Sequence, residues 1–135
     1  MKILVVEDSN TSRMYLREIL RDVTGRDTEI DCAASGEEAL EKYEQGRLAG
    51  KSYNLIFMDI ILPGMDGLQA LEKIRDIEQR NKLSEEEKTK AIVTTALDDD
   101  AKATRAFFQC EAISYITKPI TIEKIRSELD KFGLI

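Results

Sequence analysis

The sequence predicts an α/β fold in which parallel β-strands alternate with α-helices. Five short apolar or β-branched runs alternate with five helical patterns along the 135 residues. Three of the strand-like runs, residues 3–6, 55–58 and 92–93, are apolar on both faces, as strands covered by helices on both sides should be. Short connections between the elements favour parallel strands joined by right-handed crossovers.

Each element has a local signal. The expected strands are residues 2–6, 29–33, 53–58, 91–94 and 112–117. The expected helices are residues 11–23, 36–48, 67–80, 99–109 and 122–132, and four of them follow a predicted N-cap, namely Asn10, Ser35, Asp66 and Thr121. Ser35-x-x-Glu38 has the pattern of a capping box, and Ser84-x-x-Glu87 predicts one further capped turn in the irregular stretch 81–90.

Composition limits the chemistry. The length suits one domain, and the net charge of −6 argues against a nucleic-acid-binding surface. No run has the length of a membrane span and no signal-peptide pattern precedes the first strand, so a cytoplasmic protein is expected. Two cysteines without a CxxC pattern indicate free thiols. The absence of histidine excludes Ser-His and Cys-His nucleophile pairs and a His-to-Asp relay within the chain.

Polar side chains follow four of the expected strands. Glu7 and Asp8 follow the first, Asp59 the third, Thr95 the fourth and Lys118 the fifth. Because the carboxyl ends of parallel strands share one edge of an open sheet, we expect these groups to meet. Three carboxylates, one hydroxyl and one ammonium would together bind a divalent cation, Mg²⁺ above all, and a phosphoryl group.

Asp59 is the strongest candidate among them. A carboxylate directly after a buried apolar strand is unfavourable unless it is paired or binds metal. As a nucleophile it could accept a phosphoryl group to form an acyl phosphate. The simpler alternative is an N-cap or turn former before Pro63-Gly64.

The other groups have structural alternatives too. Glu7-Asp8 could serve only the positive N-terminus of the next helix, and Thr95 could be an ordinary β-branched strand end. Tyr115 could be an edge-strand aromatic or a side chain that swings between inward and outward positions. Lys118 could pair with Asp59, and a cis bond before Pro119 would aim it inward.

Taken together, the motifs resemble the response-regulator receiver family of two-component signalling. They are residues 3–8 ILVVED, 57–68 FMDIILPGMDGL, 92–96 IVTTA and 115–119 YITKP. The resemblance covers nearly the whole chain and implies a flavodoxin-like, doubly wound five-stranded parallel sheet in the order 2-1-3-4-5. Chemotaxis receivers of this family have the same strand order.

The resemblance also implies roles for individual residues. Asp59 would be the phosphoacceptor, and Thr95 and Lys118 would contact the phosphoryl group. Mg²⁺, with Mn²⁺ as an alternative, would bind Glu7, Asp8, Asp59 and the backbone carbonyl of Ile61. Thr95 and Tyr115 would form the switch.

Some positions depart from the common family pattern or bear on its chemistry. Glu7 stands where Asp is frequent, and the stretch CEAIS before Tyr115 lacks the usual glycine-rich turn. Ile61 and Leu97 are bulky and apolar at positions that tune hydrolysis in the family, so slow loss of phosphate is expected.

The resulting hypothesis is a phosphorylation-dependent switch rather than an enzyme, with self-catalysed phosphotransfer and slow autodephosphorylation only. A histidine kinase or histidine phosphotransfer protein would phosphorylate Asp59, and the face of the fourth helix, fifth strand and fifth helix would then change its affinity for a downstream protein. A single receiver domain over residues 1–135 without an output domain is expected, as monomer or phosphorylation-linked dimer, with no nucleic acid or membrane partner.

Three rival functions remain open on the sequence alone. A pseudo-receiver would act as an interaction module without phosphorylation. A phosphatase of the haloacid-dehalogenase type would need a second acid where Ile61 stands. A flavodoxin would need a phosphate-binding loop where Glu7 and Asp8 would repel the ligand.

Overall fold

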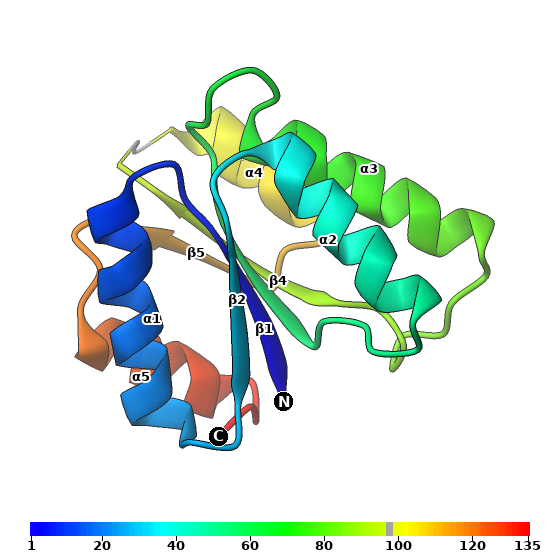
Figure 1. Cartoon of the computed structure of the whole chain (residues 1–135). Helices are drawn as coiled ribbons and strands as arrows, with labels where there is room; N and C mark the ends of the chain where they lie inside the picture. The colour runs from blue at the N-terminus through cyan, green and yellow to red at the C-terminus, as the bar shows by residue number, and fades with distance from the viewer. Residues whose placement is uncertain (97–98) are drawn as a thin grey trace.

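The computed structural model describes residues 1–96 and 99–135 of the chain. Within them, one parallel sheet has five strands in the order β2-β1-β3-β4-β5, as the family resemblance implied. Figure 1 shows the sheet between two layers of helices, with α1 and α5 on one face and α2, α3 and α4 on the other. The predicted fold class and strand order are therefore confirmed.

The strands match the sequence prediction with small shifts. Their bounds are β1 Lys2–Val6, β2 Glu29–Ala33, β3 Leu55–Asp59, β4 Lys90–Thr95 and β5 Ser114–Thr117. β5 begins two residues later than predicted because the Ala112 N–H donates to the Ala106 carbonyl and closes the end of α4. β3 runs on through Asp59, whose partner in the β4 register is Thr94.

The helices also match closely. Their bounds are α1 Asn10–Thr24, α2 Gly36–Leu48, α3 Gly67–Arg80, α4 Asp100–Phe108 and α5 Ile122–Lys131. The prediction of Asn10 as N-cap was wrong, because Ser9 caps α1 by accepting the Ser12 N–H at 3.3 Å. Asp99 likewise caps α4 instead of opening it.

The other predicted caps are present. Ser35, Asp66 and Thr121 each accept a backbone N–H of the first helical turn. The Ser35 box is altered, because the Glu38 carboxylate accepts the N–H of Ala34 rather than that of Ser35. Ser84 and Glu87 exchange both bonds of a capping box, at 3.1 and 3.3 Å, as predicted for the stretch 81–90.

Two apolar layers stabilise the sheet. Leu4 and Val6 of β1 pack on the side of α2, α3 and α4, whereas Ile3 and Val5 pack on the side of α1 and α5. All four side chains are at most 1% exposed. Burial of such side chains stabilises the fold by about 1.5–3 kcal/mol each. The two-sided apolar pattern of the sequence is thus the pattern of a central strand.

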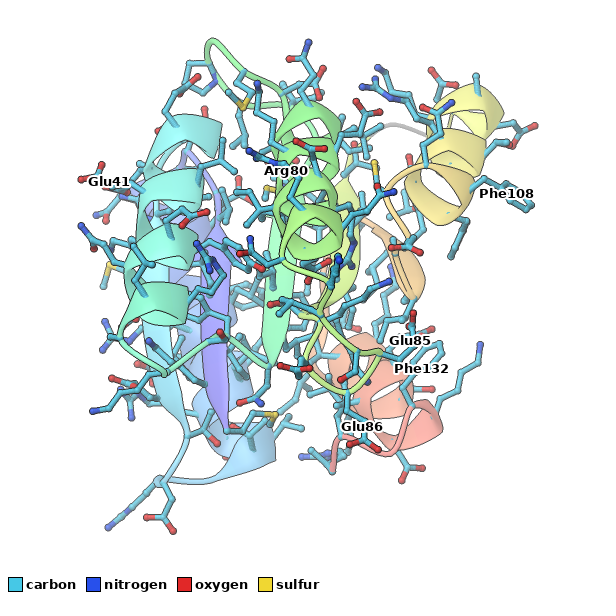
Figure 2. All side chains as sticks on the ribbon, turned by 90° about the vertical axis from the view of Figure 1, so that its right-hand side faces the viewer. Glu41, Arg80, Glu85, Glu86, Phe108 and Phe132 are labelled. Atoms are coloured by element: carbon cyan, nitrogen blue, oxygen red, sulfur yellow. The ribbon has the colours of Figure 1, made fainter. Side chains whose placement is uncertain are left out.

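The surface carries charged and a few aromatic side chains. In Figure 2, Glu41 and Phe108 point outward from α2 and α4, and Glu85 and Glu86 project from the loop after α3. Phe108 is 83% exposed. Cys32 and Cys110 are both free thiols, as predicted. Among the described helices, none has the length and apolar character needed to cross a membrane.

A buried ion pair ties α3 to the start of β4. Arg75 Nη1 lies 2.6 Å from Glu78 Oε1 and 2.7 Å from the Thr89 carbonyl oxygen. The other Glu78 oxygen accepts the Thr89 N–H at 2.8 Å. We call Arg75, Glu78 and Thr89 the Arg75 cluster. The guanidinium also donates to the carbonyls of Cys110 and Glu111.

The Arg75 cluster explains how the CEAIS stretch turns without glycine. Glu111 adopts a φ of +53°, which is unfavourable for a residue with a side chain. Its carbonyl accepts from Arg75 at 3.3 Å, and its carboxylate lies 3.8 Å from Arg75 and 3.7 Å from Lys88. These contacts stabilise a conformation that glycine would adopt freely.

Candidate functional site

The predicted carboxylates meet at the carboxyl edge of the sheet. Val6 of β1 is paired with Met58 of β3, so the residues that follow them are neighbours. One carboxylate oxygen from each of Glu7, Asp8 and Asp59 lies within 4.8 Å of the others. The alternative in which Glu7 and Asp8 only precede a helix does not account for this convergence with Asp59.

The three acids differ in exposure. Glu7 is 3% exposed and Asp59 is 4% exposed, whereas Asp8 faces solvent. The Glu7 N–H donates to the Ala33 carbonyl of β2, which continues the β1 ladder into the site. The carboxylates therefore form a crevice with a buried floor and one acid at its solvent-facing rim.

Lys118 joins two of the acids. Its Nζ donates to Glu7 Oε2 at 2.9 Å and to Asp59 Oδ2 at 3.1 Å. The Lys118 N–H donates to the Thr95 carbonyl at 2.7 Å, and the bond from Lys118 to Pro119 is cis. Burial lowers the pKa of Lys118, but the hydrogen bond with Glu7 and the charge of Asp59 outweigh burial and raise the pKa above its ordinary value. Lys118 is therefore held in its charged form.

One ammonium does not balance three carboxylates. Burial raises the pKa of Glu7 from 4.5 to about 7, and the Asp59 carboxylate adds to this while Lys118 opposes it. When all three acids are ionised, the cluster with Lys118 carries two net negative charges. Oxygen ligands in this number and this excess of negative charge suit a hard divalent cation.

The turn from β3 to α3 passes close to Asp59. Its Oδ1 accepts the Ile61 N–H at 3.3 Å. A side-chain carbon added at Gly67 would lie only 1.9 Å from the Asp59 carbonyl oxygen, so this position requires glycine. Glu37 of α2 accepts the Met65 N–H at 3.0 Å and holds the far side of the turn. The Ile61 side chain is 53% exposed beside the site.

The two residues expected to form the switch lie on neighbouring strands. Thr95 is fully buried at the end of β4. Tyr115 of β5 is half-buried, pairs in register with Val93 and packs against the core on the side of α2, α3 and α4. Leu97, the other residue predicted to tune hydrolysis, lies outside the described residues.

One contributor was missed by sequence reasoning. Arg13 in the first turns of α1 donates from Nη1 to the carbonyls of Glu7 and Asp8, at 2.7 and 3.1 Å. A signal was present, because a cation near the positive N-terminus of a helix is unfavourable without a local partner.

Comparison with known proteins agrees with the fold and the site. The family model of the response regulator receiver domain matches residues 3–130. The chain belongs to this family. It is 32% identical over 133 residues to the two-component response regulator ORR41 of Oryza sativa subsp. japonica, covering 98% of this chain and 94% of that protein.

Other relatives are much longer than this chain. It is 35% identical over 135 residues to hybrid signal transduction histidine kinase L of Dictyostelium discoideum, covering 98% of the chain but 7% of that protein. It spans 44% of the sensory transduction protein LytR of Staphylococcus haemolyticus, at 34% identity. The receiver region, and not the whole of these proteins, is what the chain shares with them.

Solved structures show the same relationship. The receiver domain of a Saccharomyces cerevisiae response regulator, crystallised with a histidine phosphotransfer signalling protein, has a TM-score of 0.81 and 25% identity and matches 99% of this chain and 89% of that one. The Borrelia burgdorferi CheX-CheY-BeF₃-Mg²⁺ complex gives 0.78 and 26%, with 98% and 89% covered. The chain is a receiver domain with the acidic pocket typical of a phosphoacceptor site.

Proposed function

We propose that this protein is a phosphorylation-dependent signalling switch and that Asp59 is its phosphoacceptor. The observation that carries the proposal is the position of the Asp59 carboxylate, buried at the end of β3, 3.1 Å from Lys118 Nζ and within 4.8 Å of the Glu7 and Asp8 carboxylates. A buried nucleophile beside one ammonium and two further acids has the groups that phosphoryl transfer needs.

The site residues fit a divalent cation. Glu7, Asp8 and Asp59 would hold Mg²⁺, or Mn²⁺ in its place, together with the Ile61 carbonyl. When bound, the cation supplies positive charge that stabilises the oxygens of the transferring phosphoryl group. Asp8, at the exposed rim, gives access from solvent. Asp59 would attack phosphorus as the phosphorus–nitrogen bond of the donor histidine breaks, and Lys118 would pair with the new phosphoryl oxygens.

The donor histidine lies outside this sequence, which contains none. The structural likeness to a receiver crystallised with a histidine phosphotransfer protein supports a donor of that kind or a histidine kinase. We place this exchange in the cytoplasm. The signal would pass to a downstream protein, which the monomer or a phosphorylation-linked dimer would bind.

The response would begin at Thr95 and Tyr115. The Thr95 hydroxyl would move toward the phosphoryl group, and Tyr115 would turn inward beside it, which changes the face of α4, β5 and α5. Such a two-state element needs a bias of only a few kcal/mol from the phosphate.

The first test is phosphorylation by a small-molecule phosphodonor, read by intact mass with and without Mg²⁺. One added phosphoryl group that requires Mg²⁺ is expected for the wild type and for Asp76→Asn, a control on the exposed surface of α3. Asp59→Asn should gain none. No adduct on the wild type would contradict the switch and favour an interaction module without phosphorylation.

The lifetime of the phosphoprotein tests the role of Ile61. Its exposed apolar side chain offers no group to orient an attacking water, so slow autodephosphorylation is expected. Ile61→Asn should shorten the half-life about tenfold, which corresponds to about 1.4 kcal/mol of barrier. Decay that is already rapid, and that Ile61→Asn leaves unchanged, would show that Ile61 does not protect the phosphate.

A further inference from the structure

Arg13 makes an unusual set of contacts beside the acidic site. Its Nη1 lies 2.7 Å from the Glu7 carbonyl oxygen and 3.1 Å from the Asp8 carbonyl oxygen, and its Nη2 lies 3.2 Å from Asn10 Oδ1. All three acceptors lie between the end of β1 and the first residue of α1. The guanidinium thus binds the main chain of the same two acids whose carboxylates belong to the site.

The two acids depend on Arg13 to different degrees. Glu7 is held at three points: its N–H by Ala33, its carboxylate by Lys118 and its carbonyl by Arg13. Asp8 lies beyond the strand ladder with an exposed side chain, and Arg13 holds its carbonyl. Loss of the guanidinium should therefore free Asp8 more than Glu7.

We propose that Arg13 is a positioning residue that orders Asp8, and with it the acid pair, for binding a divalent cation. The inference rests on the proposed function, because it assumes that the acids bind the cation. Arg13 Nη1 donates to the carbonyl oxygens of both Glu7 and Asp8, so it fixes the peptide planes on both sides of Asp8. The Asp8 carboxylate then loses less conformational freedom when it binds a cation.

The positive charge of Arg13 has an effect that opposes positioning. A positive charge near the site should repel a cation, but Arg13 is partly exposed and its charge is screened by water. The two effects predict opposite results on removal of the side chain. If positioning dominates, Mg²⁺ binds more weakly; if repulsion dominates, Mg²⁺ binds more tightly. We expect positioning to dominate, because groups that orient metal ligands commonly change metal affinity by about tenfold or more.

The test is calorimetric titration of Mg²⁺ into the wild type, Arg13→Met and Arg13→Lys, with Arg17→Met as the matched control from the exposed side of α1. Arg13→Met should raise the Kd for Mg²⁺ about tenfold. Arg13→Lys, which keeps the charge but not the fork, should also raise it. Arg17→Met should leave it unchanged. Melting temperatures without Mg²⁺ report whether each variant is folded.

Two further readouts separate positioning from general damage. The Mg²⁺ concentration for half-maximal phosphorylation should rise in Arg13→Met while the rate at saturating Mg²⁺ stays near that of the wild type. In an Asp8→Asn background, Arg13→Met should add little further loss of Mg²⁺ affinity, because its effect passes through Asp8.

Failure of the proposed function and failure of the Arg13 inference give different results in these experiments. No Mg²⁺ binding by the wild type would overturn the proposed function together with this inference. Wild-type binding with an unchanged or lower Kd in Arg13→Met would overturn the inference alone. Full additivity with Asp8→Asn would do the same.

Discussion

The Arg75 cluster and the site at Lys118 use the same kinds of groups in opposite ways. In the Arg75 cluster one buried carboxylate, Glu78, has a partner on each oxygen, Arg75 on one and the Thr89 N–H on the other. At the site, Lys118 is shared between two buried carboxylates, and a third lies close by. The first arrangement is balanced and can stabilise the fold, whereas the second retains an excess of negative charge that a bound cation or a proton on Glu7 would relieve.

The two clusters also lie at opposite ends of β4. Thr89 precedes the first residue of the strand, and Thr95 is its last. The amino end therefore carries the contacts that fix the molecule, and the carboxyl end carries those available for chemistry. This division follows from the fold, because loops at the carboxyl edge lead into helix N-termini, which favour anions.

The largest difference in stability between the two clusters should appear when the positively charged side chain of each is replaced by methionine. Arg75→Met leaves Glu78 fully buried without its charge partner and should lower the free energy of unfolding by about 3–5 kcal/mol. Lys118→Met should lower it by only about 1 kcal/mol, because Glu7 can take up a proton. Urea denaturation at pH 7 measures both. Arg80→Met, at an exposed ion pair with Asp76, is the control and should change it by less than about 0.5 kcal/mol. Equal losses of unfolding free energy in Arg75→Met and Lys118→Met would contradict the distinction between a balanced and an unbalanced cluster.

The second largest effect should be a pH dependence of stability that comes from the site and not from the Arg75 cluster. The pKa of Glu7 is raised from 4.5 to about 7 in the folded protein, so between these values the folded state binds more protons than the unfolded state. The contribution of Glu7 is fully present below pH 4.5 and is lost as the pH rises through 7, by about 3 kcal/mol in total. Urea denaturation from pH 5 to 8 without divalent cations should show this decline, and Glu7→Gln should flatten it. A Glu7→Gln profile parallel to that of the wild type would exclude Glu7 as its source.

Removal of one acid from the site should stabilise the protein. Asp59→Asn takes away a negative charge from the unbalanced cluster and should raise the free energy of unfolding without Mg²⁺ by about 1 kcal/mol at pH 8. It should also reduce the stabilisation that Mg²⁺ confers. Thermal unfolding with and without Mg²⁺ checks both effects. Glu78→Gln at the balanced Arg75 cluster should instead destabilise the protein. A loss of stability in both variants would contradict the proposed difference in charge balance between the two clusters.

The smallest effect is expected at the turn beside the Arg75 cluster. Glu111→Gly removes the strain of the +53° φ, but it loses two long ion pairs and increases the conformational entropy of the unfolded chain. The net change in the free energy of unfolding should therefore stay within about 0.5 kcal/mol. Lys82→Gly, also at a φ of +53°, is the matched control. A much larger loss for Glu111→Gly than for Lys82→Gly in urea denaturation would show that the Glu111 carboxylate matters to the cluster.

Sequence reasoning was most successful where one local pattern determines the structure. Two-sided apolar strands predicted the parallel sheet, and the strand ends placed Glu7, Asp8, Asp59 and Lys118 at one edge. The choice of Asn10 over Ser9 failed because both are good N-caps and they are adjacent. The roles of Thr95 and Tyr115 stay predictions, as does the absence of an output domain.

Some contacts that sequence reasoning missed lie between distant segments. Arg75 and Glu78 are spaced as an ordinary surface pair on a helix, and nothing local shows that Thr89 and Cys110 cover them. The contact of Arg13 with the acid pair is local and was missed for a different reason. Its partners are backbone carbonyls, which carry no residue-type signal, so only the cation near a helix N-terminus pointed to it.

The close approach of Gly67 to the Asp59 carbonyl has a consequence for mutational tolerance. Position 67 should accept no other residue in a saturation library selected for signalling, because even alanine would collide with the backbone that bears the Asp59 carboxylate. Gly64, where an added side-chain carbon would meet only the Glu37 carboxylate at 3.2 Å, should tolerate Asn, which adopts its positive φ readily and brings no negative charge beside Glu37. The two glycines of this turn, alike in sequence, would thus have very different substitution spectra.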